Sequence, residues 1–190
     1  ANLKVDNSGH NNIDFLLNAF KKNNKKDSSN VEYKIKSLKL KDSYFSFSKQ
    51  KAKRPILKDI LNPDSLRFSN INVDIALNVL KKDTLNLVLK SLNCEERSGL
   101  KIENISTLIA GGKKNAKIPL LNIQLANTNL NINDIELTYD SLSDFKNFTQ
   151  KIKLKIPIEN SSIQLKDLKS IVPQFKNTNH KLEINGNISG

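Results

Sequence analysis

Residues 117–140 read KIPLLNIQLANTNLNINDIELTYD, and this stretch decides the fold class. Apolar residues recur there at alternate positions, and Asn, Gln, Asp, Glu and Thr fill most positions between them. Successive side chains of a β-strand point to opposite faces, so the pattern predicts antiparallel strands with one apolar and one hydrated face. The alternating residues are Leu121, Ile123, Leu125, Leu130, Ile132, Ile135 and Leu137.

The same alternation continues through most of the chain, and Gly111-Gly112 is typical of a hairpin turn within it. The predicted fold is mainly β: a curled antiparallel sheet, shaped like a β-taco, a half-barrel or a sandwich, with a few short helices. The repeated units are expected at about residues 31–48, 71–110, 117–140, 151–168 and 181–190. Further members of the apolar face are Leu85, Leu87, Leu89, Ile152, Leu154, Ile156 and Ile158.

Four polar pairs interrupt the alternation at comparable places: Asp42-Ser43, Arg97-Ser98, Asn127-Thr128 and Asn160-Ser161. Asp, Asn, Ser and Thr side chains bond to nearby backbone groups and favour turns or bulges. The apolar phase shifts by one residue across such a pair, which would move side chains to the other face. A turn or bulge at each pair therefore keeps the apolar residues on one common face.

One helix is predicted at about residues 12–22, where apolar residues follow helical spacing. Its stripe consists of Ile13, Leu16, Leu17 and Phe20. The chain contains no methionine and stops within an alternating pattern, so residues 1–190 are expected to be one β-rich segment of a larger protein. No apolar run approaches the roughly 18 residues that a membrane-spanning helix needs.

The formal charge of +12 raises the question of nucleic-acid or anionic-membrane binding. Of the 31 basic residues only Arg54, Arg67 and Arg97 are arginines, and arginine is the side chain suited to bidentate phosphate recognition. We therefore expect a solvated lysine surface and no nucleic-acid partner. Lysines can still attract anionic lipid headgroups as point charges.

The sequence offers no catalytic constellation, and we expect neither enzyme activity, nor a cofactor, nor a metal site. His10 and His180 lack the spacing of metal ligands, and Cys94 is followed by two glutamates that would raise its pKa. Gly111-Gly112-Lys113-Lys114 lies between predicted strands rather than before a helix, so it reads as a turn. Four acidic residues read as solvated strand and loop charges: Asp134, Glu136, Asp140 and Asp144.

Strands of the form Leu-x-Ile-x-Leu-x-Asn-Thr-x-Leu-x-Ile at residues 121–132 resemble those of TamB and AsmA-like proteins. The C-terminal pattern at 182–190, the opening FLLNAFKK at 15–22 and the order of motifs from 71 to 100 resemble the N-terminal half of TamB-like proteins. The resemblance covers about nine-tenths of the chain and rests on order and spacing rather than on any one residue.

The resemblance implies a periplasmic body of repeated strands, anchored to the inner membrane by an upstream helix. It also implies a curled sheet with an apolar groove, a role in phospholipid movement between the membranes, and outer-membrane integrity. Assembly of outer-membrane proteins with a barrel partner is a further implication. The family has no catalytic residues to carry over.

Two interpretations of the apolar face stay open from the sequence. The face either forms a trough for phospholipid acyl chains or packs into the closed core of a sandwich or half-barrel. A separate alternative is an interaction scaffold, in which exposed edge strands assist the assembly or secretion of outer-membrane proteins by strand pairing.

Overall fold

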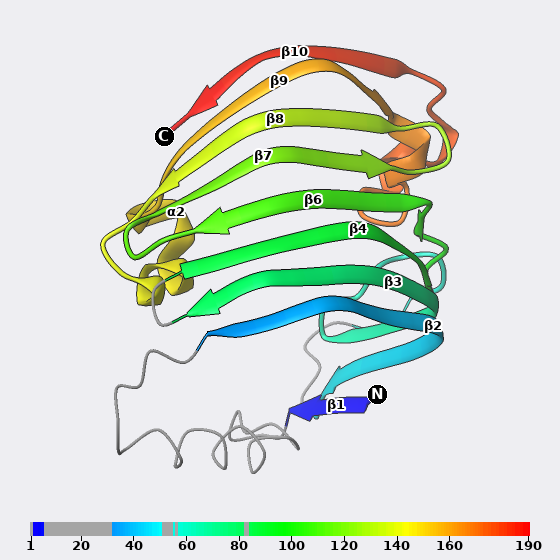
Figure 1. Cartoon of the computed structure of the whole chain (residues 1–190). Helices are drawn as coiled ribbons and strands as arrows, with labels where there is room; N and C mark the ends of the chain where they lie inside the picture. The colour runs from blue at the N-terminus through cyan, green and yellow to red at the C-terminus, as the bar shows by residue number, and fades with distance from the viewer. Residues whose placement is uncertain (1, 6–31, 51–54, 56, 82–83) are drawn as a thin grey trace.

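The computed structural model of the chain describes residues 2–5, 32–50, 55, 57–81 and 84–190. Figure 1 shows that nearly all of them belong to one sheet. The predicted helix at about 12–22, with its stripe of Ile13, Leu16, Leu17 and Phe20, lies outside the described residues.

Ten strands make up the sheet, and short helical turns connect some of them. The strands are β1 (Asn2–Val5), β2 (Tyr33–Lys49), β3 (Ser65–Lys81), β4 (Thr84–Glu96), β5 (Lys101–Ile102), β6 (Asn104–Gly111), β7 (Asn115–Gln124), β8 (Asn129–Thr138), β9 (Lys153–Gln164) and β10 (Lys181–Ser189). The helical turns are the 3₁₀-helices η1 (Leu142–Asn147), η2 (Leu165–Leu168) and η3 (Pro173–Asn177) and the single α-helical turn α2 (Phe148–Lys151).

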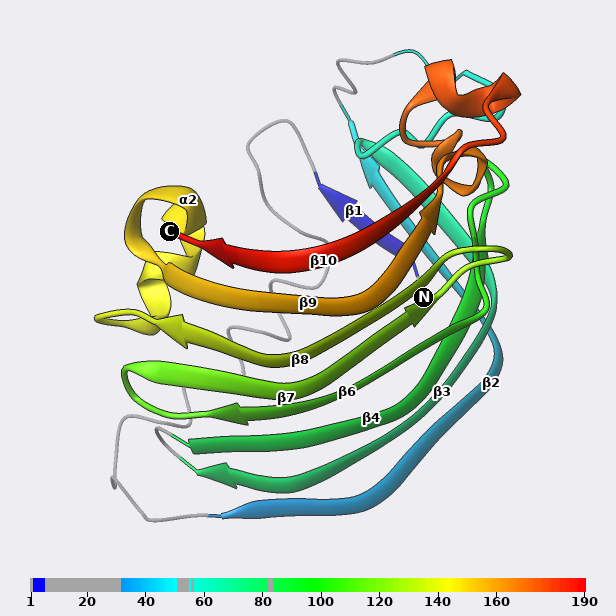
Figure 2. The same cartoon turned by 90° about the horizontal axis from the view of Figure 1, so that it is seen from above.

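The strands follow one another in the order β1-β2-β3-β4-β6-β7-β8-β9-β10, with β5 paired beside β4. All pairs are antiparallel except β1 with β2. Within the described residues the sheet does not close on itself, and its long strands bend so that it curls around a concave side (Figure 2). The predicted mainly β, curled antiparallel sheet is confirmed, and the Gly111-Gly112 turn joins β6 to β7 as expected.

The register places the alternating apolar residues in continuous rows across the sheet. Directly paired residues of neighbouring strands lie on the same face, so a chain of such pairs identifies one face of the whole sheet. One row crosses seven strands and is apolar apart from one threonine. Its members, from β2 to β9, are Leu38, Ile75, Leu89, Thr107, Leu121, Ile132 and Ile158.

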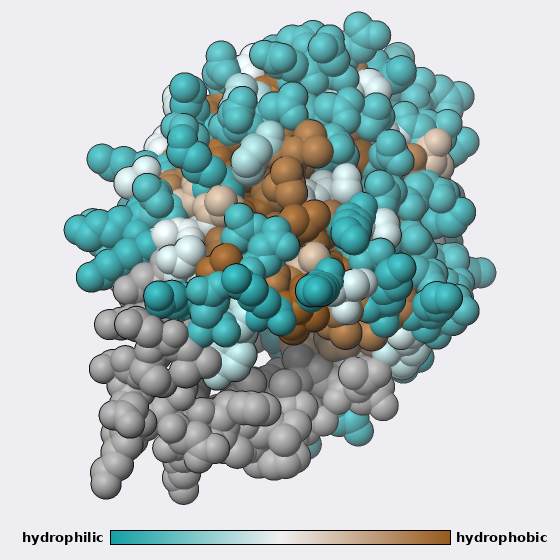
Figure 3. Space-filling view, viewed as in Figure 1, coloured by the Kyte–Doolittle hydropathy of each residue, from teal (hydrophilic) through white to brown (hydrophobic). Residues whose placement is uncertain are grey.

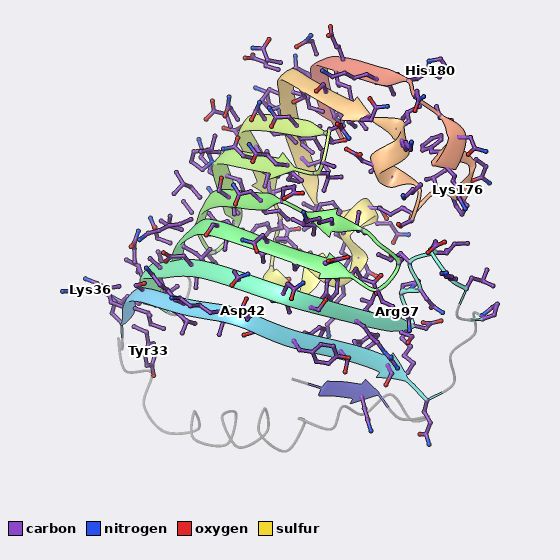
Figure 4. All side chains as sticks on the ribbon, turned by 90° about the vertical axis from the view of Figure 1, so that its right-hand side faces the viewer. Tyr33, Lys36, Asp42, Arg97, Lys176 and His180 are labelled. Atoms are coloured by element: carbon purple, nitrogen blue, oxygen red, sulfur yellow. The ribbon has the colours of Figure 1, made fainter. Side chains whose placement is uncertain are left out.

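Polar bulges keep this face continuous along each strand. Asp42, Asn70, Asp134 and Asn160 have φ angles of 43°, 52°, 55° and 48°, and each lies at a shift of register with a neighbouring strand. Asp and Asn tolerate this left-handed conformation better than other residues with a side chain. Figure 4 shows Asp42 part-way along β2.

The four predicted polar pairs divide into two structural types. Asp42-Ser43 and Asn160-Ser161 lie at bulges inside β2 and β9, whereas Asn127-Thr128 and Arg97-Ser98 lie in turns that follow β7 and β4. Two bulges are stapled from the next strand: the Asp42 N–H donates to Asn72 Oδ1 at 3.0 Å, and the Asn160 N–H donates to an asparagine of β10 at 2.8 Å. The repeated element is therefore a polar corner, used both within strands and between them.

The convex face, turned toward the viewer in Figures 1 and 3, is mostly hydrophilic. A narrow apolar band crosses its middle strands in Figure 3. The register places Ala76, Val88, Leu108 and Leu120 in one row on the face opposite the concave side. Leu108 is 37% exposed there. The expectation of one apolar and one hydrated face therefore holds with this local exception.

Glu96 organises the end of β4, where its side chain is only 1% exposed. Its carboxylate accepts the N–H of Arg67 at 3.0 Å and the N–H of Ser98 at 2.7 Å. Burial alone would raise the pKa of Glu96, but hydrogen bonds from Ser98 and Arg67 and the charge of Arg97 lower it below its ordinary value of 4.5.

Acid should therefore loosen this end of the sheet. Because the folded-state pKa of Glu96 is lowered, its contribution to stability is present above pH 4.5 and is lost as the pH falls through the folded-state pKa. Urea unfolding midpoints measured between pH 7 and pH 3 should fall less steeply for Glu96→Gln, which starts less stable at pH 7. Glu95→Gln, on the exposed neighbour, is the matched control, and equal profiles for both variants would contradict this role.

Candidate functional site

The apolar rows face the concave side of the sheet. A pocket there is lined by residues of these rows, including Leu85, Ile109, Ile118 and Leu137, together with Phe145 of η1. Figure 2 shows the η1–α2 segment on the concave side of the strands. Because Phe145 of η1 lines the same pocket as residues of the apolar rows, these rows face the concave side. No second sheet covers this side among the described residues.

The structure brings most of the predicted site residues together on this concave face. They are half-buried, apart from Ile135, which is 5% exposed. Because few large apolar side chains are fully buried, the described part of the chain has only a small closed core. The residues on the rows are Leu85, Leu87, Leu89, Leu121, Ile123, Leu130, Ile132, Ile135, Leu137, Leu154, Ile156 and Ile158.

Two predicted site residues have other positions. Leu125 follows the last residue of β7 and lies in the turn toward β8, where its N–H donates to the carbonyl oxygen of Thr128 at 3.0 Å. Ile152 precedes β9 and packs in a small buried cluster with Ala116 and Tyr139. Ile152 therefore supports the end of the sheet as a core residue.

The pocket at this end of the sheet has a volume of about 630 Å³, within the range of small-molecule sites. Its floor is apolar, and Thr84, Lys113, Asp140 and Ser141 stand among its polar lining residues. A hollow of this size, apolar inside and polar at some of its edges, suits a hydrophobic chain with a charged or polar end.

Tyr139 and Phe145 form the aromatic cover of the pocket. Tyr139 is 4% exposed, and its ring meets the ring of Phe145 edge-on, with centroids 5.0 Å apart. The Tyr139 hydroxyl lies 2.7 Å from the Gly112 carbonyl oxygen and 2.9 Å from that of Asn115, to which it donates a shared hydrogen bond. Burial raises the pKa of Tyr139. The tyrosine thus ties the β6–β7 turn to the aromatic cover.

Asp144 holds η1 in position over the pocket. Its carboxylate accepts the N–H of Ser141 at 2.8 Å and the N–H of Asp140 at 3.0 Å, and it lies 3.7 Å from the ammonium of Lys151. The Ser141 N–H, followed by the Asp140 N–H and the charge of Lys151, lowers the pKa of Asp144 against the opposing effect of burial. The Asp144 carboxylate therefore serves as the cap of η1, through these hydrogen bonds and the lysine contact.

The remaining candidates for chemistry are placed separately from one another. Cys94 is buried, and burial raises the pKa of its thiol, which disfavours the reactive thiolate. His180 is exposed, and His10 lies outside the described residues. Glu136 pairs with Lys117 at 3.1 Å, and Asp134 occupies a bulge. Among the described residues, no group of three His, Cys, Asp or Glu could hold a metal ion.

Sequence reasoning omitted several residues that belong to this face. Ile75 pairs with Leu89 and so belongs to the same apolar row. Ile109 and Ile118 were omitted because each stands beside a hairpin or a proline that hides the alternation. Phe145 carried no signal, because its position depends on how η1 folds back onto the sheet.

Comparison with known protein families, curated proteins and solved structures finds no match for this chain. Within the part of the chain that the structure describes, no helix has the length and apolar character needed to cross a membrane.

Proposed function

We propose that this chain is a non-enzymatic, periplasmic segment of a TamB/AsmA-like envelope protein anchored to the inner membrane. Its concave face would hold the acyl chains of phospholipids that pass between the inner and outer membranes, and so support outer-membrane integrity. The observation that carries the proposal is the seven-strand apolar row on a concave face that no second sheet covers in the described residues.

The energetics favour an apolar occupant. Each methylene group buried on such a face contributes about 0.8 kcal/mol, and the half-buried leucines and isoleucines gain from losing the water that they still contact. An acyl chain has no hydrogen-bonding groups to satisfy, so it can lie at any position along the rows. A peptide would bring polar backbone groups that this face cannot pair.

The charge of the chain suits the other end of a phospholipid. The net charge of +12 attracts anionic headgroups, because each lysine ammonium group acts on them as a point charge, as at membrane surfaces. Lys113 stands beside the apolar pocket, where the end of a bound lipid could meet it. The combination of an apolar floor and a positive net charge on the chain favours an anionic lipid over a neutral hydrophobic ligand.

Lipid that co-purifies with the chain tests the proposal. The protein is produced in the periplasm of a diderm bacterium, purified without detergent, and examined by native mass spectrometry and by lipid extraction. We expect phospholipid bound at a reproducible ratio and displaced by added long-chain fatty acid. A protein that carries no lipid, and that takes up none from vesicles containing phosphatidylglycerol, would contradict the proposal.

A second function is an interaction scaffold that assists outer-membrane protein assembly by strand pairing. The outer edge of β10 has no partner strand among the described residues, and residues 33–43 of β2 likewise lie beyond the short stretch paired with β1. Such edges can accept a further strand. Binding of alternating outer-membrane strand peptides by a lipid-free protein would favour this function, whereas lipid without peptide binding favours the first.

A further inference from the structure

A second hollow lies at the opposite end of β4 from the apolar pocket. Thr84 and Leu85, at the start of β4, line the apolar pocket, whereas Ser98 and Gly99, just beyond its last residue, line the second hollow. The second hollow has a volume of about 340 Å³. Figure 4 shows Arg97 and Lys176 toward this end of the sheet, away from Tyr33 and Lys36.

Hydrogen bonds fasten three separate segments around this hollow. Ser170, which is almost completely buried, donates from its hydroxyl to the Ser98 carbonyl oxygen at 3.0 Å. The Ser170 carbonyl oxygen accepts the N–H of Leu61 at 2.8 Å. The turn after β4, the loop before β3 and the connection between η2 and η3 are thereby held together, so the walls of the hollow are built by the fold.

The walls carry an excess of positive charge. Lys58, Lys169 and Lys176 line the hollow, and Asp59 is the one carboxylate among the described residues that line it. None of the three lysines forms an ion pair within the described parts of the chain. Like charges held around one hollow repel each other, and a bound anion would relieve that repulsion.

The Ser98 hydroxyl adds an unused donor. Ser98 is 3% exposed, and its Oγ has no hydrogen-bond partner in the described structure. It lies near enough to Glu96 to help lower the pKa of that carboxylate, but not in hydrogen-bonding geometry with it. Buried hydroxyl groups without a partner are uncommon and cost free energy. Beside it, Gly99 has a φ of +83°, and the space where a Cβ would stand is open.

We propose that this hollow binds a phosphate group, with Lys58, Lys169 and Lys176 supplying the charge and the Ser98 hydroxyl donating a hydrogen bond. Lysine serves phosphate as a point charge, and a serine hydroxyl can turn its hydrogen toward an incoming oxygen. The group could be a free phosphate or the headgroup of a phospholipid. The proposal stands apart from the apolar groove, since the two hollows lie at opposite ends of β4.

The test titrates the whole chain at low salt with inorganic phosphate, glycerol 3-phosphate and the soluble lipid dihexanoyl phosphatidic acid. We expect saturable binding, followed by calorimetry and by shifts of the Ser98 and Gly99 amide signals in NMR spectra. Equal affinity for the three probes assigns the site to phosphate itself, and affinity at least about tenfold higher for the lipid assigns it to a headgroup. Absence of saturable binding up to about 10 mM would overturn the proposal.

Variants separate a specific site from general attraction to a basic protein. Lys58→Gln, Lys169→Gln and Lys176→Gln combined should weaken binding at least about tenfold, because each charged contact contributes more than a neutral hydrogen bond. The control replaces three exposed lysines elsewhere, Lys36, Lys41 and Lys155, and removes the same charge. Equal weakening in both triple variants would overturn the proposal.

Ser98→Ala tests the donor separately. It should weaken phosphate binding several-fold, because it removes the proposed donor. A small loss of thermal stability is expected in the phosphate-free protein, because the Ser98 side chain also helps lower the pKa of Glu96. Unchanged phosphate affinity in Ser98→Ala, with unchanged amide shifts at Gly99, would exclude the hydroxyl from the site.

Discussion

Ile118→Glu should reduce binding of a fluorescent long-chain fatty acid by roughly a hundredfold, measured by titration of the purified chain. Ile118 lies in the apolar pocket and pairs with Ile135 of the next strand. A carboxylate at this position must either lose its hydration or hold water in the pocket, and both outcomes oppose an acyl chain. The substitution therefore acts on the one property that the proposed trough requires.

Leu108→Glu is the matched control, since it makes the same change on the convex face. Leu108 belongs to the row of apolar residues there, and it is exposed enough for a carboxylate to stay hydrated. Fatty-acid binding should stay close to that of the unchanged chain. Circular dichroism and a thermal melt confirm that both variants are folded. Equal loss in both variants, or no loss in Ile118→Glu, would remove the concave face as the lipid site.

Tyr139→Ala should lower the free energy of unfolding by about 3–5 kcal/mol, as expected for the loss of a large buried aromatic side chain. The ring packs with Ala116 and Ile152, and the hydroxyl ties down the turn after β6. Small domains are stable by only about 5–15 kcal/mol, so this one change removes a large share. Urea unfolding followed by circular dichroism gives the measurement.

Two further tyrosine variants show which part of the side chain matters. Tyr139→Phe keeps the ring and removes only the hydroxyl, so it should cost about 1–3 kcal/mol, since two carbonyl oxygens lose their donor. Tyr33→Ala removes an exposed ring at the start of β2 and should change stability by less than about 0.5 kcal/mol. A Tyr139→Ala variant as stable as Tyr33→Ala would show that the cover does not hold the end of the sheet.

The strands could be predicted because a half-buried sheet imposes a period of two on its sequence. The alternation that places Leu121 and Ile132 on one face can be read directly from the sequence, and the register pairs these two residues. The bulges were predictable by the same rule, and the two that were missed, at Asn70 and Asp134, also show a phase slip beside an Asp or Asn. Each phase slip next to a short polar residue could have been assigned as a bulge.

The open form of the sheet and the two hollows could not be predicted from the sequence. A leucine facing a trough and a leucine facing a second sheet obey the same alternation, so periodicity cannot separate them. The lysine-lined hollow depends on a hydrogen bond between Ser170 and Ser98, which are 72 residues apart. Contacts at such separation arise from the way the connections fold back, and no local pattern encodes them.

The bulges bend each strand in which they occur, so the long axis of the concave face runs perpendicular to the strands. The cross-section of this face depends on where each strand is bent, and its length depends on the number of strands. From β2 to β10 the strands span roughly 34 Å at the usual spacing of neighbouring strands. Insertion or deletion of one hairpin, which is two strands, would thus lengthen or shorten the concave face by about 10 Å and leave its cross-section unchanged.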